Sequence, residues 1–323
     1  MVIVALVRTR LALAALLLSV GPAAADDVLK VAIGQMDTWV NQAAVLGQRV
    51  GIFKKQGIVL ENFATQGSGE TLQAVISNAA QIGIGVGTLG VLRAYSKGAP
   101  IRIIGASFTG VGDLYWYVRS DSPISKLSDA KESNTIAFSS SGSSVHSVVL
   151  AFAQNLGLKA KPIQTGGLAT TLTQVMSGQI DIGWATPPFG LKEAEEGKVR
   201  IIANGNDVAS LRDQTVRVEI VNEATWNNRD LMKRLMRAYR DSLDWIFSDP
   251  LAVKLYSETA GVSENLVRSS IDKFELKAAK QLDRISGVDA MMAEGVKFKF
   301  LDKPLSQEQL LDLIRILPNG GQP

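Results

Sequence analysis

A serine-rich turn carries the strongest chemical signal in the sequence. Residues 139–144 read Ser-Ser-Ser-Gly-Ser-Ser, after an apolar run typical of a strand and before a stretch typical of a helix. The first N–H groups of a helix have no partner within it, and together with the helix dipole they bind anions or polar oxygen atoms. Serine hydroxyls add donors, and Gly142 permits a close approach of the backbone. A plain serine cap is the alternative for this turn taken alone.

Two further glycine-rich turns, Ser68-Gly69-Glu70 and Thr165-Gly166-Gly167, stand at the same kind of junction. Ligands of open α/β sheets bind at the carboxyl ends of the strands, so we expect the three turns to converge on one cleft. Trp39 follows the first predicted strand and Trp184 closes a later one. Aromatic walls around polar donors are typical of small-molecule sites, although a packing role is the alternative for Trp39.

The remaining reactive residues do not indicate a catalytic site. His146 is the only histidine, and the chain has no cysteine, which excludes thiol catalysis and disulfides. Ser143 and Ser144 lie too near His146 in sequence for a spatially assembled triad. The glycine-rich stretch at 83–87 lacks the full dinucleotide-binding fingerprint, and no metal-ligand spacing occurs. We therefore expect no enzymatic activity, no metal and no cofactor.

Hydrophobic patterning predicts the elements that hold these turns. Short apolar runs of strand length alternate with helical stretches, a pattern of parallel βαβ units and hence of an α/β fold. The predicted strands are 28–33, 58–60, 82–86, 101–106, 114–119, 135–138, the vicinity of 163, 180–184 and 199–203. The predicted helices are 41–55, with Gly57 as its C-cap, then 71–78, 145–156 and one that ends near 177. From 230 to 317 the pattern is mostly helical, and we expect this region to wrap around one lobe.

An internal repeat organises the chain. Residues 71–77 read Thr-Leu-Gln-Ala-Val-Ile-Ser and residues 171–177 read Thr-Leu-Thr-Gln-Val-Met-Ser, and Ile82-Gly83 matches Ile182-Gly183 at the same offset of 100 residues. This period is too long for a solenoid. Two copies, each preceded by a glycine-rich turn, predict two similar α/β lobes.

The N-terminus has the three parts of a secretory signal. Arg8 and Arg10 precede the apolar run 11–20, and Ala23-Ala24-Ala25 supplies small residues for cleavage near Ala25. The apolar run is shorter than the roughly 20 residues that span a bilayer. Loss of the two arginines lowers the formal charge from +3 to +1, because residues 1–25 contain no acid. This near-neutral chain has no basic run, so we expect no nucleic-acid partner.

Across its mature length the sequence resembles a periplasmic solute-binding component of an ABC transporter, of the nitrate/sulfonate/taurine type. No single motif is diagnostic, but the order and spacing of several together are specific. The motifs are Leu29-Lys30-Val31-Ala32-Ile33-Gly34, Gly51-Ile52-Phe53-Lys54-Lys55-Gln56-Gly57-Ile58, Gly67-Ser68-Gly69, Ile124-Ser125-Lys126-Leu127-Ser128-Asp129 and Ser177-Gly178-Gln179-Ile180-Asp181.

The resemblance implies a two-lobed, type II-like periplasmic binding protein with two parallel-rich α/β lobes joined by two crossing strands. It divides the chain into a signal peptide (1–25), a discontinuous lobe 1 (26–116 plus 222–323) and lobe 2 (117–221). It implies a monomer in the periplasm that closes over a small-molecule ligand and then meets an ABC permease at the membrane.

By position, the resemblance also implies a set of ligand-binding residues from both lobes. They are Gln35, Trp39, Ser68, Gly69, Glu70, Thr88, Ser141, Gly142, Ser143, Thr165, Trp184 and Thr186. The serine turn would hold an anionic or polar head group, and Trp39 and Trp184 would pack on the ligand body.

Two departures bear on the ligand. The cleft turns contain no arginine, although anion sites often use one, and Arg217 or Arg119 would have to reach in from elsewhere. Glu70 would repel an anion unless it points away. Both points disfavour nitrate and leave an organic sulfonate, an amine-bearing compound like taurine, or a neutral heterocycle.

Two other functions fit the same architecture. One is a pyrimidine-synthesising enzyme of the thiamine-biosynthesis type, which uses histidine and a cysteine-containing motif that this chain lacks. The other is a sensory module that passes its ligand signal to a membrane receptor, and the sequence does not separate sensing from transport.

Overall fold

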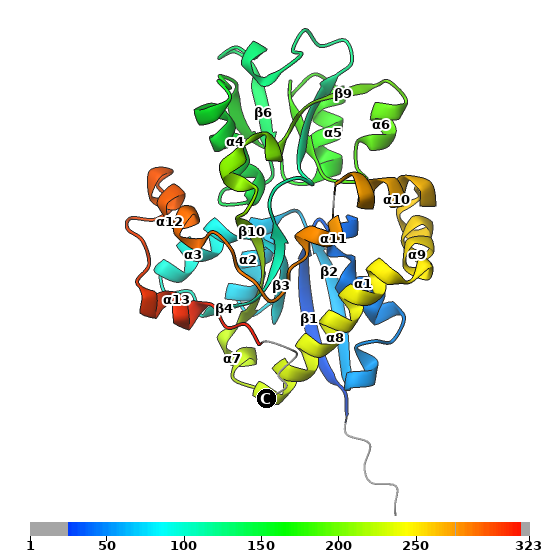
Figure 1. Ribbon diagram of the computed structural model, residues 1–323, viewed down its shortest axis with the longest axis vertical. Helices are drawn as coiled ribbons and strands as arrows, with labels where there is room; N and C mark the ends of the chain where they lie inside the picture. Colours follow the sequence, from blue (N-terminus) through cyan, green and yellow to red (C-terminus); the bar gives the residue numbers. More distant parts are fainter. Residues whose placement is uncertain (1–24, 275, 318–323) are drawn as a thin grey trace, which may run out of the picture.

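The computed structural model describes residues 25–274 and 276–317, which form two lobes stacked along the long axis (Figure 1). Residues 1–24 of the predicted signal peptide lie outside the described residues. Within the described ranges, no helix combines the length and the apolar character needed to cross a membrane.

Lobe 1 is built on a five-stranded sheet in the order β2-β1-β3-β10-β4. Its strands are β1 (Asp27–Gly34), β2 (Ile58–Thr65), β3 (Ile82–Gly87), β4 (Ile101–Thr109) and β10 (Thr215–Asn222). β1 runs parallel to β2 and β3, whereas β10 runs antiparallel to β3 and β4. All eight residues of β10 are buried, and the sequence did not predict this strand.

Helices cover both faces of this sheet, because alternate residues of each strand point to opposite sides. Val31 and Ile33 of β1 pack with α1 (Gln42–Arg49), α8 (Arg229–Ser248) and α9 (Pro250–Ala260). Ala32 packs on the other face with α2 (Ser68–Ile76), α3 (Thr88–Ser96), α12 (Val288–Lys297) and α13 (Gln307–Leu313). The predicted helix 41–55 is shorter than expected, because Gly51 has a left-handed φ of 79° after α1 ends.

Lobe 2 repeats this strand order. The strands β5 (Tyr115–Arg119), β8 (Gly183–Ala185) and β9 (Val199–Asn204) form one antiparallel group, and β6 (Thr135–Phe138) pairs in parallel with β7 (Lys161–Gln164). Backbone bonds from Ala137 N to Ile182 O (2.8 Å) and from Ile182 N to Thr135 O (3.0 Å) join the groups. The resulting order β7-β6-β8-β5-β9 matches β2-β1-β3-β10-β4, with the antiparallel strand fourth in both.

The repeat seen in the sequence extends to hydrogen bonds. The hydroxyls of Thr65 and Thr71 lie 2.6 Å apart in lobe 1, and those of Thr165 and Thr171 lie 2.7 Å apart in lobe 2. In each case the second threonine donates to a glycine carbonyl at the helix start. These residues anchor α2 and α5 (Leu168–Met176), which the two copies of the repeat form. Lobe 2 is completed by α4 (Ser144–Asn155) and α6 (Leu191–Glu195).

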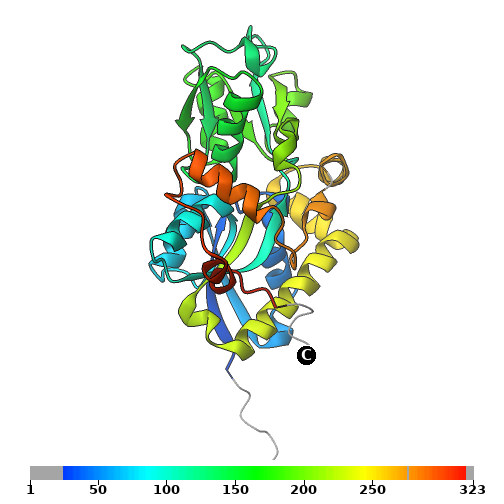
Figure 2. The same cartoon turned by 60° about the vertical axis from the view of Figure 1, so that its left-hand side comes forward.

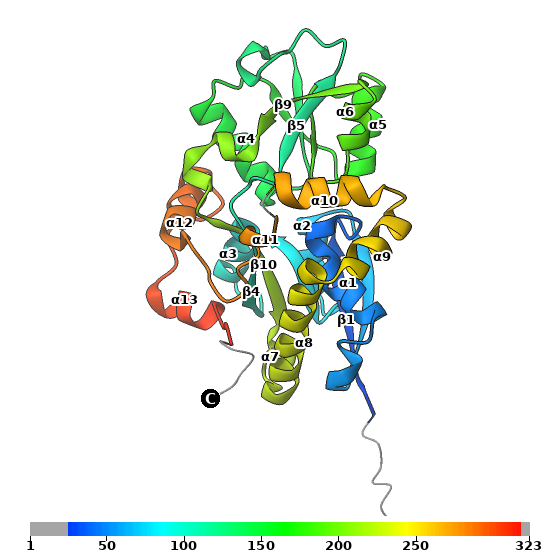
Figure 3. The same cartoon turned by 45° about the vertical axis from the view of Figure 1, so that its right-hand side comes forward.

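The C-terminal region is helical as predicted, but it contacts both lobes. Besides α8, α9, α12 and α13 it contains α7 (Glu223–Trp226), α10 (Glu264–Lys273) and α11 (Leu276–Ala279). α10 lies beneath lobe 2 (Figure 3), where Leu266 and Phe274 pack on the lobe 2 core. α12 lies beside the junction of the lobes (Figure 2). Short 3-10 turns occur at Trp39–Asn41, Lys54–Gln56, Leu127–Asp129, Gly205–Asp207 and Ala209–Leu211.

Candidate functional site

A polar cavity of about 30 Å³ lies between the lobes, where strands of both sheets end. It is bounded by the turns after β1 and β2 on one side and by the turns after β6 and β8 on the other. Its lining residues are Gly34, Gln35, Thr38, Asn41, Gly67, Ser68, Gly85, Leu114, Ser139, Ser143, Ser144, Val145, Trp184, Thr186 and Arg217. Its position is the one expected for a ligand of open α/β sheets.

Two residues that line this cavity each have a buried donor without a hydrogen-bond partner among the described residues. The donors are Nε of Arg217, a residue that is 8% exposed, and Nε1 of Trp184, which is 2% exposed. Arg217 comes from β10 of lobe 1 and Trp184 from β8 of lobe 2. An unpaired buried donor costs free energy, so each of the two groups would gain from an acceptor brought within its reach.

Two serine hydroxyls add donors from the same lobes. The Ser68 hydroxyl accepts from Gly87 N–H, and the Ser143 hydroxyl caps α4 by accepting from His146 N–H at 3.1 Å. Each hydroxyl therefore keeps its own hydrogen available for a ligand. Ser68 begins α2 and Ser143 precedes α4, so the positive ends of two helix dipoles also meet here.

Two partners, Asp113 and Phe108, hold the guanidinium group of Arg217 in place. Its Nη2 donates to Oδ1 of Asp113, which is fully buried between β4 and β5. Its Cζ lies 4.3 Å from the ring centroid of Phe108. The other carboxylate oxygen of Asp113 accepts from Thr186 Oγ1 at 3.1 Å. Asp113 thus ties Arg217 of lobe 1 to lobe 2.

From the sequence, Arg217 was expected to reach the cleft only from outside the cleft turns. In the structure Arg217 lines the cavity from β10. The signal that would have found it is the alternation in Thr-Val-Arg-Val-Glu-Ile-Val-Asn at 215–222, a strand pattern with charged residues at alternate positions. Arg119, the other arginine considered, pairs with Asp121 and is exposed to solvent. An arginine therefore lines the cleft, although none of the cleft turns supplies it.

Five of the predicted ligand residues line the cavity: Gln35, Ser68, Ser143, Trp184 and Thr186. The donors of two of them are already engaged. Gln35 Nε2 donates to Gln66 O at 3.0 Å, and Thr186 Oγ1 donates to Asp113. An anion in the cavity would therefore face Ser68, Ser143 and Trp184 from the predicted set, together with Arg217.

The other predicted residues do not line this cavity. Trp39 is buried in the lobe 1 core, with its ring edge-on to Tyr256 and Phe247 at 5.2 and 6.1 Å. Thr88 donates to Thr215 O, and Thr165 is bonded to Thr171. Glu70 is exposed, and its carboxylate accepts from Gln66 N–H at 2.7 Å, away from the cavity. Its expected repulsion of an anion is thereby relieved.

The rest of the serine turn joins the lobes to each other. Ser140 Oγ accepts from Gly69 N–H of α2, and the Gly142 carbonyl accepts from Gly90 N–H of α3, both at 3.1 Å. Ser141 is exposed. Parts of the turn predicted to bind a ligand are therefore bonded to helix N-termini of the opposite lobe.

His146 packs beside the turn and does not line the cavity. Its ring stacks on Phe138 at 4.3 Å and meets the edge of Phe300 from the C-terminal region at 5.4 Å. Its Nδ1 accepts from Gly142 N–H at 3.3 Å. Burial lowers the pKa of His146 from 6.5 to about 4, which keeps the ring neutral near pH 7.

A larger groove of about 670 Å³ opens between the lobes next to the cavity. Two segments contribute to the walls of both. Gln35, Thr38 and Asn41 line the cavity while Met36, Asp37 and Gln42 line the groove, and Pro188, Phe189 and Gly190 of the groove follow Thr186 of the cavity. The groove offers mixed apolar and polar walls for a ligand body larger than the cavity holds.

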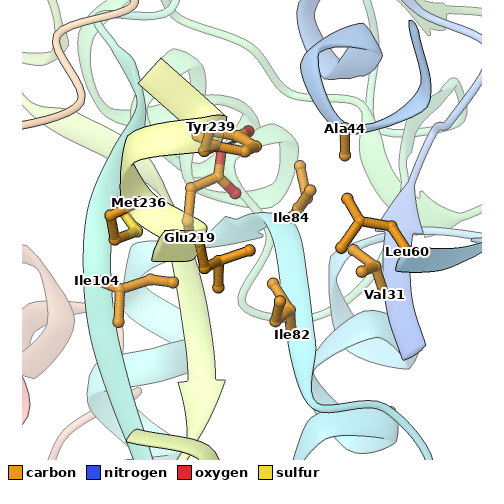
Figure 4. A pocket seen from close by; sticks show the side chains of 10 residues that line it. Val31, Ala44, Leu60, Ile82, Ile84, Ile104, Glu219, Met236 and Tyr239 are labelled. Atoms are coloured by element: carbon orange, nitrogen blue, oxygen red, sulfur yellow. Dashed lines mark hydrogen bonds between the residues drawn. The ribbon is translucent and has the colours of Figure 1, made fainter. Parts of the chain in front are cut away.

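Another cavity, of about 20 Å³, lies inside the lobe 1 core (Figure 4). Aliphatic side chains of β1, β2 and β3 surround it, and Glu219 and Tyr239 lie together at one end. The Glu219 carboxylate accepts from Tyr239 OH at 2.8 Å and from Gly85 N–H at 2.9 Å. This volume is about that of one water, so it is not the site of an organic ligand.

Comparison with solved structures finds the same fold at low identity. The alkanesulfonate-binding protein SsuA of Xanthomonas axonopodis pv. citri, bound to MOPS, is 17% identical, covers 91% of this chain and 100% of its own, and has a TM-score of 0.74. The periplasmic aliphatic sulphonate binding protein SsuA of Escherichia coli is 16% identical, with coverages of 88% and 91% and a TM-score of 0.65. A putative sulfonate ABC transporter protein, the periplasmic sulfonate-binding protein SsuA of Methylobacillus flagellatus KT, is 15% identical, with coverages of 90% and 92% and a TM-score of 0.60.

These matches confirm the predicted two-lobed periplasmic binding protein fold. No curated protein matches the chain. A family profile described as "NMT1/THI5 like" matches residues 42–252, which run from α1 of lobe 1 through all of lobe 2 to α9. The chain therefore belongs to the NMT1/THI5-like family.

Proposed function

We propose that this protein is the exported solute-binding component of an ABC importer and captures a small organic oxyanion of the sulfonate type. The observation that carries the proposal is the pair of unpartnered buried donors, Arg217 Nε and Trp184 Nε1, which belong to residues that line one interlobe cavity from lobe 1 and from lobe 2. With the hydroxyls of Ser68 and Ser143 they offer four donors, and an oxyanion supplies acceptors on all of its oxygen atoms.

The shape of the site supports an organic anion rather than an inorganic one. The cavity of about 30 Å³ has room for only one or two waters, so we propose that the lobes separate slightly to take a head group there. The groove of about 670 Å³ beside it has room for an attached body. Phe189 and Leu172 supply apolar surface in the groove. In this arrangement Trp184 contacts the head group, whereas Trp39 has only a packing role.

In this proposal the ligand is captured when the two lobes close over it. The division at 117–221 that the resemblance implies is shifted by the sheets, because β10 (Thr215–Asn222) belongs to the sheet of lobe 1 and β5 of lobe 2 begins at Tyr115. We propose lobe 2 at 115–204, with bending in the segments that connect the sheets, 110–114 and 205–214. Closure brings Ser68 and Arg217 to Ser143 and Trp184, so only the closed form offers all four donors. A monomer released to the periplasm after cleavage near Ala25 would then present the closed lobes to a membrane permease.

The enzymatic alternative, a pyrimidine-synthesising protein of the thiamine-biosynthesis type, finds less support. His146 packs between Phe138 and Phe300 and accepts a bond from the backbone, so it is not placed for proton transfer in the cavity. The sequence also contains no cysteine.

Titration calorimetry with ethanesulfonate tests the proposal. Trp184→Phe removes the indole donor and keeps an aromatic ring, and we expect an affinity loss of about 10- to 100-fold, the range for a hydrogen bond to a charged group. Trp39→Phe is the matched control, because Trp39 Nε1 is also buried and unpartnered among the described residues but does not line the cavity. Equal losses in both variants, or no binding of any organic anion, would reject the proposal.

A further inference from the structure

We infer that the buried Asp113–Arg217 pair makes this cavity select monoanionic oxyanions over dianions of the same shape. The inference rests on the proposed function and names the charge class of its ligand. Among the residues that the structure describes, Arg217 is the only charged one that lines the cavity, and Asp113, which accepts its hydrogen bond, has no exposed surface. The positive charge offered to the ligand is therefore already paired with a negative one.

The next charged neighbours are also balanced. Glu219, two residues along β10, is 2% exposed and holds Gly85 N–H and Tyr239 OH. Lys280 follows α11, and burial lowers its pKa to about 8. The charges of Glu219 and Asp113 act to raise this pKa, whereas the charge of Arg217 lowers it further. These four ionisable groups are thus two acids, Asp113 and Glu219, and two bases, Arg217 and Lys280.

One negative charge on a ligand finds a partner here, and a second does not. The first is met by the free donors of Arg217 and Trp184, by two serine hydroxyls and by two helix N-termini, which stabilise an anion without a second full positive charge. The second negative charge on a ligand is repelled by the Asp113 carboxylate, because like charges a few ångströms apart repel strongly in a poorly solvated interior. We expect discrimination of at least about tenfold in affinity.

The test compares methanesulfonate with sulfate by titration calorimetry on the full mature chain. Both present a tetrahedral sulfur with oxygen atoms, but sulfate carries a second charge where methanesulfonate has a methyl group. Methylphosphonate is the third ligand of the test. Its charge changes without a change in its size, because it is a monoanion in mild acid and a dianion in mild base. We expect methanesulfonate to bind at least about tenfold more tightly than sulfate, and methylphosphonate to lose affinity relative to methanesulfonate in mild base.

Asp113→Asn assigns the effect to the carboxylate, because the amide keeps its size and an acceptor for Thr186. We expect the methanesulfonate-to-sulfate affinity ratio to fall by about tenfold in this variant. Asp121→Asn, at the exposed pair with Arg119, should leave the ratio unchanged. If Asp113→Asn does not fold, the wild-type comparisons still decide the selectivity.

The outcomes separate the two proposals. If no sulfonate binds, the proposed function fails. If methanesulfonate binds but sulfate or dianionic methylphosphonate binds as well or better, the charge selection is overturned and the proposed function stands. An unchanged ratio in folded Asp113→Asn would overturn the role of Asp113.

Discussion

The carbonyl oxygen of Gly142 in lobe 2 accepts a hydrogen bond from the backbone N–H of Gly90 in lobe 1, at 3.1 Å. Gly90 lies in the first turn of α3, so the serine turn of one lobe caps a helix of the other. This backbone contact requires small residues. A Cβ on Gly87 would lie 2.6 Å from the Gly142 carbonyl oxygen and 2.8 Å from Ser143 Cα.

Gly87→Ala should therefore hold the lobes apart. Its methyl group would meet lobe 2 backbone, which cannot rotate away as a side chain would, so the closed form should be disfavoured. We predict a larger radius of gyration in solution scattering and an affinity for ethanesulfonate reduced by at least about tenfold. Gly90→Ala is the comparison variant, and we expect its effect to be smaller. Its Cβ would lie farther away, at 3.1 Å from the same oxygen, and alanine stabilises the helix in which Gly90 lies. Equal scattering curves and affinities for wild type and Gly87→Ala would contradict the steric role.

The groove predicts a dependence on ligand length. Phe189 lines the groove but not the cavity, so Phe189→Ala should weaken binding of a long alkanesulfonate such as octanesulfonate by about tenfold. Methanesulfonate, which has no alkyl chain to reach the groove, should bind this variant within about twofold of wild type. Competition calorimetry with both ligands on one protein preparation checks the prediction. The same fold-loss for the short and the long ligand would remove the groove from the site.

His146 predicts a sensitivity to acid. Its pKa is lowered from 6.5 to about 4 by burial between Phe138 and Phe300, so the unfolded chain binds its proton first as the pH falls. The contribution of His146 to the free energy of unfolding is full above about pH 6.5 and declines as the pH falls towards about 4. Urea unfolding of wild type and His146→Phe at several pH values should show a steeper acid loss in wild type. Parallel pH dependences in the two proteins would contradict this expectation.

Much of the fold follows from local sequence. The strand 135–138 and the helix after the serine turn were predicted within one residue at each end, because an apolar run, a serine cap and a helical pattern follow one another directly. The internal repeat at an offset of 100 residues predicted the two lobes. The hydroxyl pairs Thr65–Thr71 and Thr165–Thr171 show that the repeat also holds for side-chain hydrogen bonds.

The parts that escaped prediction depend on contacts between distant segments. The charged residues Arg217 and Glu219 give β10 the composition of a surface segment, yet both are buried. Asp113 accepts a hydrogen bond from Arg217, and Glu219 accepts hydrogen bonds from Tyr239 OH and Gly85 N–H. α3 begins at Thr88 directly after β3, with no loop to mark its start. Trp39 follows β1 in the chain, as predicted, but it begins a 3-10 turn and its side chain lies in the lobe 1 core, a direction that sequence spacing does not fix.

A crystal structure of the mature chain with methanesulfonate tests the central claim most directly, since it locates the head group. We predict sulfonate oxygens within hydrogen-bonding distance of Arg217 Nε and Trp184 Nε1, with the methyl group directed towards the groove. A sulfonate bound away from both of these nitrogen atoms, or bound only in the groove, would contradict the claim that the interlobe cavity is an oxyanion site.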